Sequence, residues 1–365
     1  MRIKKVIRYL ESIAPPIYQE SYDNAGLIVG HPEMELKGVL FCLDSIETVV
    51  DEAISKKCNL IIAHHPIVFS GLKRFNWQNY IERTVMKAIK NDIAIYAAHT
   101  NLDNVRWGVN NKIAETLGLK NTRVLAPKKK LLRKLYTFVP TAQADLVRNA
   151  LFNAGAGNIG NYSDTSFNAV GAGTFKANEG ANPFVGQIGQ RHFEAEIKIE
   201  VIFPAHLESK IISALIRNHP YEEVAYDVVM LENQTTEVGS GMIGELAEPM
   251  NEKDFLKLVK QKMNTPVIRH TAFLNKKIQR VAVCGGAGSF LLNKAIRQKA
   301  DIFISADYKY HQFFDADGQI IIADIGHFES EQFTIDLFYD LINKKFNNFA
   351  VHKTEVNTNP VKYLY

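Results

Sequence analysis

Histidines and acidic residues gather in three short segments, each of which directly follows an apolar run of the sequence. The segments are His64-His65-Pro66, His99 to Asp103 and His327 to Glu331. Imidazole nitrogens and carboxylate oxygens bind divalent metals and also move protons in general acid–base catalysis. The residue types and their positions therefore predict a metal site assembled from distant parts of the chain.

The spacing within these segments suggests two metal ions rather than one. Pro66 favours an extended backbone at His65, in which neighbouring side chains point in opposite directions, so His64 and His65 can serve two centres. His327 and Glu331 are four residues apart at a helix start and share one helix face. A carboxylate can bridge two ions about 3.5–4 Å apart. The candidate metal ligands are His64, His65, Asp103, His327 and Glu331.

This ligand set contains nitrogen and oxygen but no sulfur, which suits Zn, Mn, Fe or Ni better than Cu(I) or an iron–sulfur cluster. His99 is either a further ligand or, as we prefer, a hydrogen-bonding neighbour that carries protons, and Glu329 is a second candidate proton carrier. Any one of these histidines could instead be a turn residue bonded to the backbone. Three strand ends with the same residue types favour a site.

Three other segments have two readings each. Gly285 to Ser289 resembles a phosphate-binding turn but fits a tight strand-to-helix turn equally well, since it matches neither the dinucleotide nor the P-loop pattern. Asp307 and His311 either line the same rim or serve as cap and surface residues. Asp23-Asn24 is a turn signal or a substrate contact.

Apolar runs alternate with amphipathic stretches on both sides of these segments. The runs at 39–44, 60–63 and 93–98 predict strands, and helical stretches follow at 46–57, 80–90 and 110–117. Runs at 281–284, 302–305 and 320–324 repeat this theme. The alternation predicts an α/β fold with parallel sheets covered on both faces, and functional side chains of such sheets collect beyond the carboxyl ends of the strands.

The glycine-rich middle of the chain differs from both flanks. It predicts a strand at 135–139, a helix at 142–153, two or more strands ending near 203, a helix at 205–218 and a strand at 224–230. This βαββαβ order is ferredoxin-like. We expect residues 1–127 and 239–365 to form the two halves of an α/β metal-binding module, and residues 128–238 to form an inserted domain. The segment Gly244 to Pro249 is expected to be a turn, followed by a helix at 252–263.

Composition limits the classes of function. With 365 residues, 46% hydrophobic and 22% charged, the chain is typical of a soluble globular protein of two or three domains. Its three cysteines, Cys42, Cys58 and Cys284, predict neither a disulfide framework nor a thiolate zinc site, which favours a cytoplasmic location. No stretch is apolar enough for a membrane span. The net charge of +4 gives no support for a nucleic-acid partner.

The segments DNAGL at 23–27, AHHP at 63–66, HTNLD at 99–103, GGAGS at 285–289 and GHFESE at 326–331 together resemble the NIF-three-like (NGG-one-interacting factor three) family. Bacterial members are commonly labelled homologues of a type-two GTP cyclohydrolase I. The middle segments AGAGNIGNYS, GAGTF and HPYEEVAYD resemble the PII/CutA-type insert of a subset of that family. The resemblance implies two divalent ions per subunit held by the five candidate ligands, and a toroidal homohexamer of identical chains.

Two functions follow as hypotheses. The first is a metal-dependent hydrolase acting on a nucleotide or a phosphorylated small molecule, with water activated by the metals as the nucleophile and GTP ring opening as one version. Zn is the metal expected in a purified sample, with Fe, Mn or Ni as other fitting ions. The second is a metal-handling or small-molecule-sensing protein without catalysis, whose insert binds a ligand through Gly155, Gly157, Gly160 and Tyr162 or through His219 to Glu223.

Overall fold

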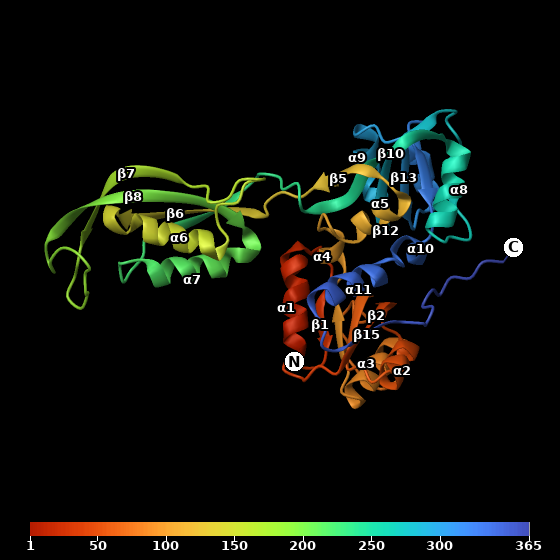
Figure 1. Ribbon diagram of the computed structural model, residues 1–365, viewed down its shortest axis with the longest axis horizontal. Helices are drawn as coiled ribbons and strands as arrows, with labels where there is room; N and C mark the ends of the chain where they lie inside the picture. Colours follow the sequence, from red (N-terminus) through yellow and green to blue (C-terminus); the bar gives the residue numbers. More distant parts are fainter. Residues whose placement is uncertain (365) are drawn as a thin grey trace. The chain divides into compact units, whose positions relative to one another are not determined.

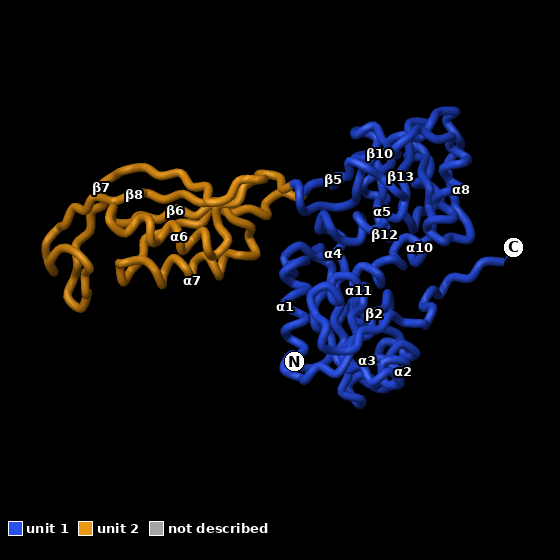
Figure 2. The backbone as a smooth tube through the Cα atoms, viewed as in Figure 1, with its two compact units in different colours: residues 1–127, 236–365 blue, residues 128–235 orange. Residues whose placement is uncertain are grey.

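The structure is a computed structural model that describes residues 1–364, and its chain divides into two compact units (Figure 2). Unit 1 combines Met1–Pro127 with the described residues from Thr236 on. Unit 2 is the continuous segment Lys128–Thr235. Unit 2 begins at the residue expected for the insert and ends three residues before the expected limit of 238.

Unit 1 contains a five-stranded sheet with the order β1-β4-β3-β2-β15. The neighbours β15, β2, β3 and β4 are parallel, and β1 pairs antiparallel with β4 at the edge. The strands are β1 (Gly26–Val29), β2 (Gly38–Asp44), β3 (Leu60–His65), β4 (Ala94–Ala97) and β15 (Ala350–Lys353). The parallel strands β2 and β3 are almost wholly buried because both of their faces are covered.

Helices cover this first sheet on both faces, as the alternating pattern predicts (Figure 1). On one face, α2 (Glu47–Ser55) and α3 (Tyr80–Lys90) place Val49 and Val85 in a core cluster with Ile61. On the other face, Phe338 of α11 (Thr334–Lys345) stacks on Phe41 with a ring-centroid distance of 6.2 Å. The helix α1 (Ile3–Ile13) packs on α11 through Tyr9 and Phe346, and it ends before Pro15 and Pro16.

A six-stranded sheet with the order β11-β14-β13-β12-β10-β5 forms the other half of unit 1. Only β12, β13 and β14 run parallel to one another. The strands are β5 (Lys120–Pro127), β10 (Gly239–Asn251), β11 (Arg269–His270), β12 (Lys277–Ala287), β13 (Ile302–Ala306) and β14 (Ile321–Asp324). Leu292 and Ala295 of α9 (Leu292–Arg297) pack with Phe303 in its core. The helices that pack on β10 and β12 are α5 (Val109–Leu117) and α8 (Glu252–Lys262).

The strands predicted from the apolar runs are parallel within each sheet, but the sequence did not predict the antiparallel strands β1, β5, β10 and β11. The segment Gly244 to Pro249 was expected to be a turn but lies inside β10. A Cβ atom at Gly244 would lie 3.0 Å from the carbonyl oxygen of Lys120 in β5. Gly244 is therefore needed because a neighbouring strand approaches closely. In the sequence alone, a glycine of this kind looks the same as a glycine in a turn.

The two halves of unit 1 exchange elements. β5 comes before the insert in sequence but joins the second sheet, where it pairs with β10. Conversely, α11 and β15 follow the last strand of the second sheet and complete the first, where β15 pairs with β2. This exchange ties the carboxyl ends of the two parallel strand sets into one unit. Between them lie two short helices, α4 (Thr100–Asp103) and α10 (His327–Glu331).

Unit 2 is a four-stranded antiparallel sheet with the order β7-β8-β6-β9. Its elements follow one another as β6 (Leu132–Pro140), α6 (Ala144–Ala154), β7 (Phe167–Lys176), β8 (Arg191–Pro204), α7 (Glu208–Asn218) and β9 (Tyr226–Leu231). Val147 of α6 and Ile211 of α7 share a core with Val201 of β8. The order is the βαββαβ order expected from the sequence; a PII/CutA-type assignment of this unit stays a prediction.

Throughout residues 1–364, every helix is too short or too polar to cross a lipid bilayer.

Candidate metal centre

The end of one strand and the short helices that follow two others bring the candidate metal ligands to one place in unit 1. His64 and His65 are the last residues of β3, Asp103 ends α4 beyond β4, and His327 and Glu331 begin and end α10 beyond β14. Their ligand atoms form three groups in which all atoms lie within 4.8 Å of one another. The groups are His64-Asp103-Glu331, His65-His327-Glu331 and His64-His65-His99.

The first group is buried and has unused polar atoms. His64 Nε2 lies 3.6 Å from Asp103 Oδ1 and 3.7 Å from Glu331 Oε1. Both His64 Nε2 and Asp103 Oδ1 are buried and have no hydrogen-bond partner among the described residues. Buried polar atoms are almost always paired, so two such atoms facing one point fit an ion that would pair with both.

The second group uses the other oxygen of the same carboxylate. Glu331 Oε2 lies 3.0 Å from His65 Nε2 and 3.1 Å from His327 Nε2, and the two nitrogens are 3.3 Å apart. Glu331, only 3% exposed, thus directs one oxygen to each group. This is the arrangement that a carboxylate bridging two ions requires.

The opposite nitrogen of each of these three imidazole rings is already engaged. His64 Nδ1 donates to the Ala98 carbonyl oxygen at 2.9 Å, His65 Nδ1 to Asp44 at 2.7 Å and His327 Nδ1 to Asp307 at 2.6 Å. Carbonyl and carboxylate oxygens only accept hydrogen bonds, so Nδ1 donates to them and Nε2 is the nitrogen that faces the centre. Histidines that bind metals are commonly held in this way.

Asp44 was not recognised as part of the site from the sequence, although it is the last residue of the predicted strand at 39–44. Its place at the carboxyl end of β2, beside His65 at the end of β3, was the available signal. Of the two roles predicted for Asp307, the structure supports a place on the rim of the site, because Asp307 accepts a hydrogen bond from His327 and orients it. His311, the other residue of that pair, is exposed, contacts Tyr310 edge-on, stacks on Phe314, and belongs to none of the three groups.

The charges of the group shift the pKa values of its members in the metal-free protein. Burial and the neighbouring Glu331 raise the pKa of Asp103 to about 7. Burial by itself would lower the pKa of His65, but Asp44 and Glu331 outweigh it and raise the value to about 9. Burial likewise opposes protonation of His327, yet Glu331 and Asp307 raise its pKa to about 11. The carboxylates around the site therefore stabilise the protonated, positively charged forms of His65 and His327.

His99 lies beside the two groups and is held by Asp23. Its Nδ1 donates to Asp23 Oδ1 at 2.8 Å, and its ring lies 5.3 Å from that of His64 and 5.4 Å from that of His65. Asp23 Oδ2 also accepts from the backbone N–H and the hydroxyl of Thr100. Asp23 thus anchors the loop that carries His99, which is more than the turn signal suggested by the sequence.

Glu329 is buried but is placed differently from the five candidate ligands. Its Oε1 accepts a hydrogen bond from Asn359 Nδ2 at 3.0 Å, and it is absent from the three groups. It lines a cavity of about 490 Å³ together with His65, His327 and Arg269. That volume is within the range of small-molecule sites, and the cavity opens beside the second group.

The glycine turn Gly285 to Ser289 supports the site but does not offer a free anion cradle. The Gly285 N–H donates to Asn110 Oδ1 at 3.0 Å and the Gly286 N–H to Ser330 Oγ at 2.9 Å. Gly286 has a φ of +59°, and a Cβ atom there would lie 2.6 Å from Glu331 Oε1. The turn is glycine so that the strand end can approach Glu331 closely.

The three cysteines are free and buried, and none belongs to the groups, so the donors are imidazole nitrogen and carboxylate oxygen. Such a set fits Zn, Fe, Mn or Ni, as expected from the sequence.

Comparison with known proteins places these residues in a family. The model of the family described as Duf34/NIF3 (NGG1p interacting factor 3) matches residues 1–360. A Bacillus subtilis protein named GTP cyclohydrolase 1 type 2 homolog is 39% identical over 99% of this chain and 98% of its own length. A Halalkalibacterium halodurans protein of the same name is 41% identical over 98% of both chains.

Solved structures agree with this comparison. A Bacillus cereus protein related to NIF3 is 40% identical and superposes with a TM-score of 0.86 over 100% of this chain and 99% of its own. The Staphylococcus aureus protein SA1388 is 30% identical, with a TM-score of 0.79 over the same shares of the two chains. Family model, relatives and fold all cover essentially the whole sequence. The chain belongs to the Duf34/NIF3 family.

Proposed function

We propose that this protein is a hydrolase that uses two divalent metal ions and acts on a nucleotide or a phosphorylated small molecule. The observation that carries the proposal is the position of Glu331, whose two oxygens face separate pairs of ligands. His64 and Asp103 would hold one ion and His65 and His327 the other, with Glu331 between them. Bound there, the ions supply activation of water and stabilisation of developing negative charge.

The chain's own residues have distinct roles in this proposal. Asp44 and Asp307 keep the imidazoles of His65 and His327 oriented, as their hydrogen bonds require. His99, held by Asp23, is placed to accept or return a proton beside the ions. Glu329 is the second candidate proton carrier, since it lines the adjoining cavity.

The cavity beside the second group is where we place the substrate. Arg269, whose guanidinium bonds Asp324 and the Tyr308 carbonyl oxygen, lies on its wall and is still half exposed. The wall also carries the carboxylates Asp44, Asp307, Asp324 and Glu329, so the attraction for an anionic substrate would come mainly from the two metal ions, with Arg269 as a further donor. The relatives named GTP cyclohydrolase 1 type 2 homolog make GTP the first compound to test.

The test is metal-dependent turnover by the purified full-length protein loaded with Zn, Mn or Fe. GTP, phosphodiesters and phosphomonoesters are the substrates, and His65→Ala and Glu331→Ala are expected to abolish turnover of any of them. His311→Ala, an exposed histidine outside the groups, is the matched control and should keep full activity. No turnover of any substrate class with any of the metals would reject the hydrolase.

In that event the same site would serve to store or deliver metal, the second function that the sequence suggests. His65→Ala would then reduce the metal content, and neither the variant nor the parent protein would show catalytic turnover. We also propose assembly into a homohexamer, which light scattering of the purified protein tests directly; a monomeric mass would reject it.

A further inference from the structure

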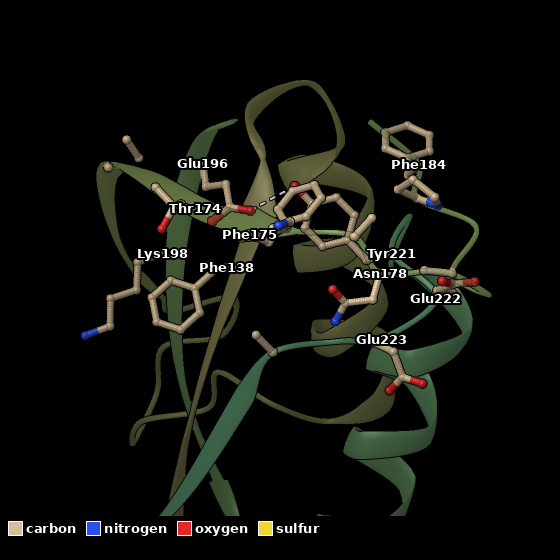
Figure 3. A pocket seen from close by; sticks show the side chains of 18 of the residues that line it. Phe138, Thr174, Phe175, Asn178, Phe184, Glu196, Lys198, Tyr221, Glu222 and Glu223 are labelled. Atoms are coloured by element: carbon tan, nitrogen blue, oxygen red, sulfur yellow. Dashed lines mark hydrogen bonds between the residues drawn. The ribbon is translucent and has the colours of Figure 1, made fainter. Parts of the chain in front are cut away.

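Unit 2 contains a cavity of about 740 Å³ that the metal chemistry does not use (Figure 3). It lies over the β7 and β8 strands and is closed by the loop after β7 and by the segment Tyr221–Glu223 after α7. Its volume is in the range of sites for small organic molecules. Of the two segments considered for ligand binding from the sequence, only His219 to Glu223 contributes to its wall.

Aromatic rings form much of the wall. Tyr221 lies between Phe175 and Phe184, with ring-centroid distances of 5.9 Å and 6.3 Å, and Phe138 lines the cavity from β6 (Figure 3). The faces of such rings carry negative potential and attract ammonium groups. Phe184 is 50% exposed, so its ring is held out into the opening rather than packed in the core.

A buried carboxylate completes the site. Glu196 of β8 is only 8% exposed, and its Oε1 accepts a hydrogen bond from the Tyr221 hydroxyl at 2.9 Å (Figure 3). Burial and the nearby Glu196 raise the pKa of Tyr221, so the phenol stays a neutral donor. Within residues 1–364 no cation pairs with Glu196. A buried charge with only a neutral partner is costly, and a bound cation would offset that cost.

The surroundings keep this charge uncompensated. Lys198 also lines the cavity, but its ammonium pairs with Glu200 at 2.8 Å and lies 4.4 Å from the Tyr136 ring. Gly173, across on β7, leaves room for the carboxylate, because a Cβ atom there would lie 2.1 Å from Glu196 Oε2. Two further carboxylates, Glu222 and Glu223, line the cavity as well.

We propose that this cavity binds a small organic cation, an alkylammonium compound whose charge lies against Glu196 and whose carbon groups contact Phe175, Phe184 and Tyr221. The inference concerns unit 2 alone and does not rest on the proposed hydrolase. It gives the insert a ligand class and makes it a binding module attached to the metal unit.

The experiment is calorimetric titration of the full-length protein with choline, tetramethylammonium and butylammonium. The uncharged isostere of choline, 3,3-dimethylbutan-1-ol, measures the contribution of the charge. At least one cation is expected to bind, and the alcohol to bind at least about tenfold more weakly than choline if choline is that cation, from the size of a desolvated cation–π contact. No binding by any of the three cations at millimolar concentration, or equal binding of the alcohol, would overturn the proposal.

Variants locate the binding. Glu196→Gln is expected to weaken binding at least about tenfold, by loss of the facing charge. Glu232→Gln, an exposed carboxylate of unit 2 that pairs with Lys130 and does not line the cavity, is the matched control and should bind like the parent protein. Equal affinity of Glu196→Gln and the parent would show that the cation binds elsewhere.

A second variant guards against misfolding of Glu196→Gln. Phe184→Ala removes a half-exposed ring from a loop, so the fold is kept while cation affinity should fall several-fold. His65→Ala should bind the cation normally, which separates this proposal from the metal function. Tight binding of GTP in place of the cations, lost in Phe184→Ala, would overturn the assigned ligand class.

Discussion

Replacement of Asp44 by asparagine tests whether the site holds two separable metal ions. Asp44 contacts only one of the two proposed metal positions, the one at His65 and His327: its Oδ1 accepts from His65 Nδ1 at 2.7 Å, and its Oδ2 accepts from the Thr358 hydroxyl at 2.6 Å. Asparagine keeps the shape but removes the charge that fixes the tautomer and raises the basicity of His65. Within residues 1–364, the hydrogen bonds and ion pairs of His64 and Asp103 do not involve Asp44.

Loss of a carboxylate that orients a metal-binding histidine typically weakens metal affinity by about 10–100-fold. This corresponds to about 1.4–2.7 kcal/mol, since each tenfold change in affinity is about 1.4 kcal/mol. We expect a loss of this size for the ion at His65 and His327 and less than about threefold for the ion at His64 and Asp103. Thr358→Val, which removes only the support of Asp44, should give the same pattern at the lower end.

The assay is calorimetric titration of metal-free protein with Zn²⁺, in which two binding events should be resolved. In Asp44→Asn one event weakens and the other stays. Asp51→Asn is the control, because Asp51 is an exposed residue of α2 that pairs with Lys87 of α3 and belongs to none of the ligand groups. Equal weakening of both events, or no weakening of either, would refute the division of the site into two centres.

Three further variants test other parts of the site. Glu331→Gln is expected to weaken both binding events by more than about 100-fold, since each oxygen of Glu331 faces one group; metal content after dialysis measures this, and retention of two ions contradicts it. Gly286→Ala should displace Glu331, which lowers the metal content and reduces the free energy of unfolding by about 1–3 kcal/mol. Gly118 also has a positive φ but open space at its Cβ, so Gly118→Ala should reduce the free energy of unfolding and leave the metal content unchanged. Asp23→Asn should lower stability: burial opposes ionisation of Asp23, but His99 and Thr100 lower its pKa to about 2. A lowered pKa stabilises the fold above the ordinary value near 3.8, so the parent should exceed the variant by about 2 kcal/mol at pH 7, and the difference should shrink as pH falls from about 4 toward 2 in urea unfolding; a constant difference would contradict it.

Much of the first sheet and the position of the site could be predicted from the sequence. Buried parallel strands such as Leu60–His65 are continuous apolar runs, and the polar residues that end them must lie at the sheet edge, because all parallel strands end on the same side. The four-residue spacing of His327 and Glu331 likewise fixes their common face, and the two side chains do lie 3.1 Å apart.

The antiparallel strands could not be predicted in the same way. β5 is half exposed and β10 carries glycines and a proline, so neither shows a continuous apolar run. Their pairing connects residues about 120 positions apart, as Gly239 with Pro127 and Met242 with Val124. Only the folded second sheet brings these segments together, since strand pairing at such separation has no local signal.

The sequence by itself determined which chemical groups are available: imidazoles and carboxylates at strand ends, no paired cysteines and an insert of different character. The tertiary structure decided how these groups are used. It gave each oxygen of Glu331 its own partners, placed Asp44 and Asp307 behind two histidines, and left Glu196 buried among aromatic rings. The physical reason is that ligand orientation and uncompensated charge depend on contacts between residues far apart in the chain, whereas residue type and local spacing do not.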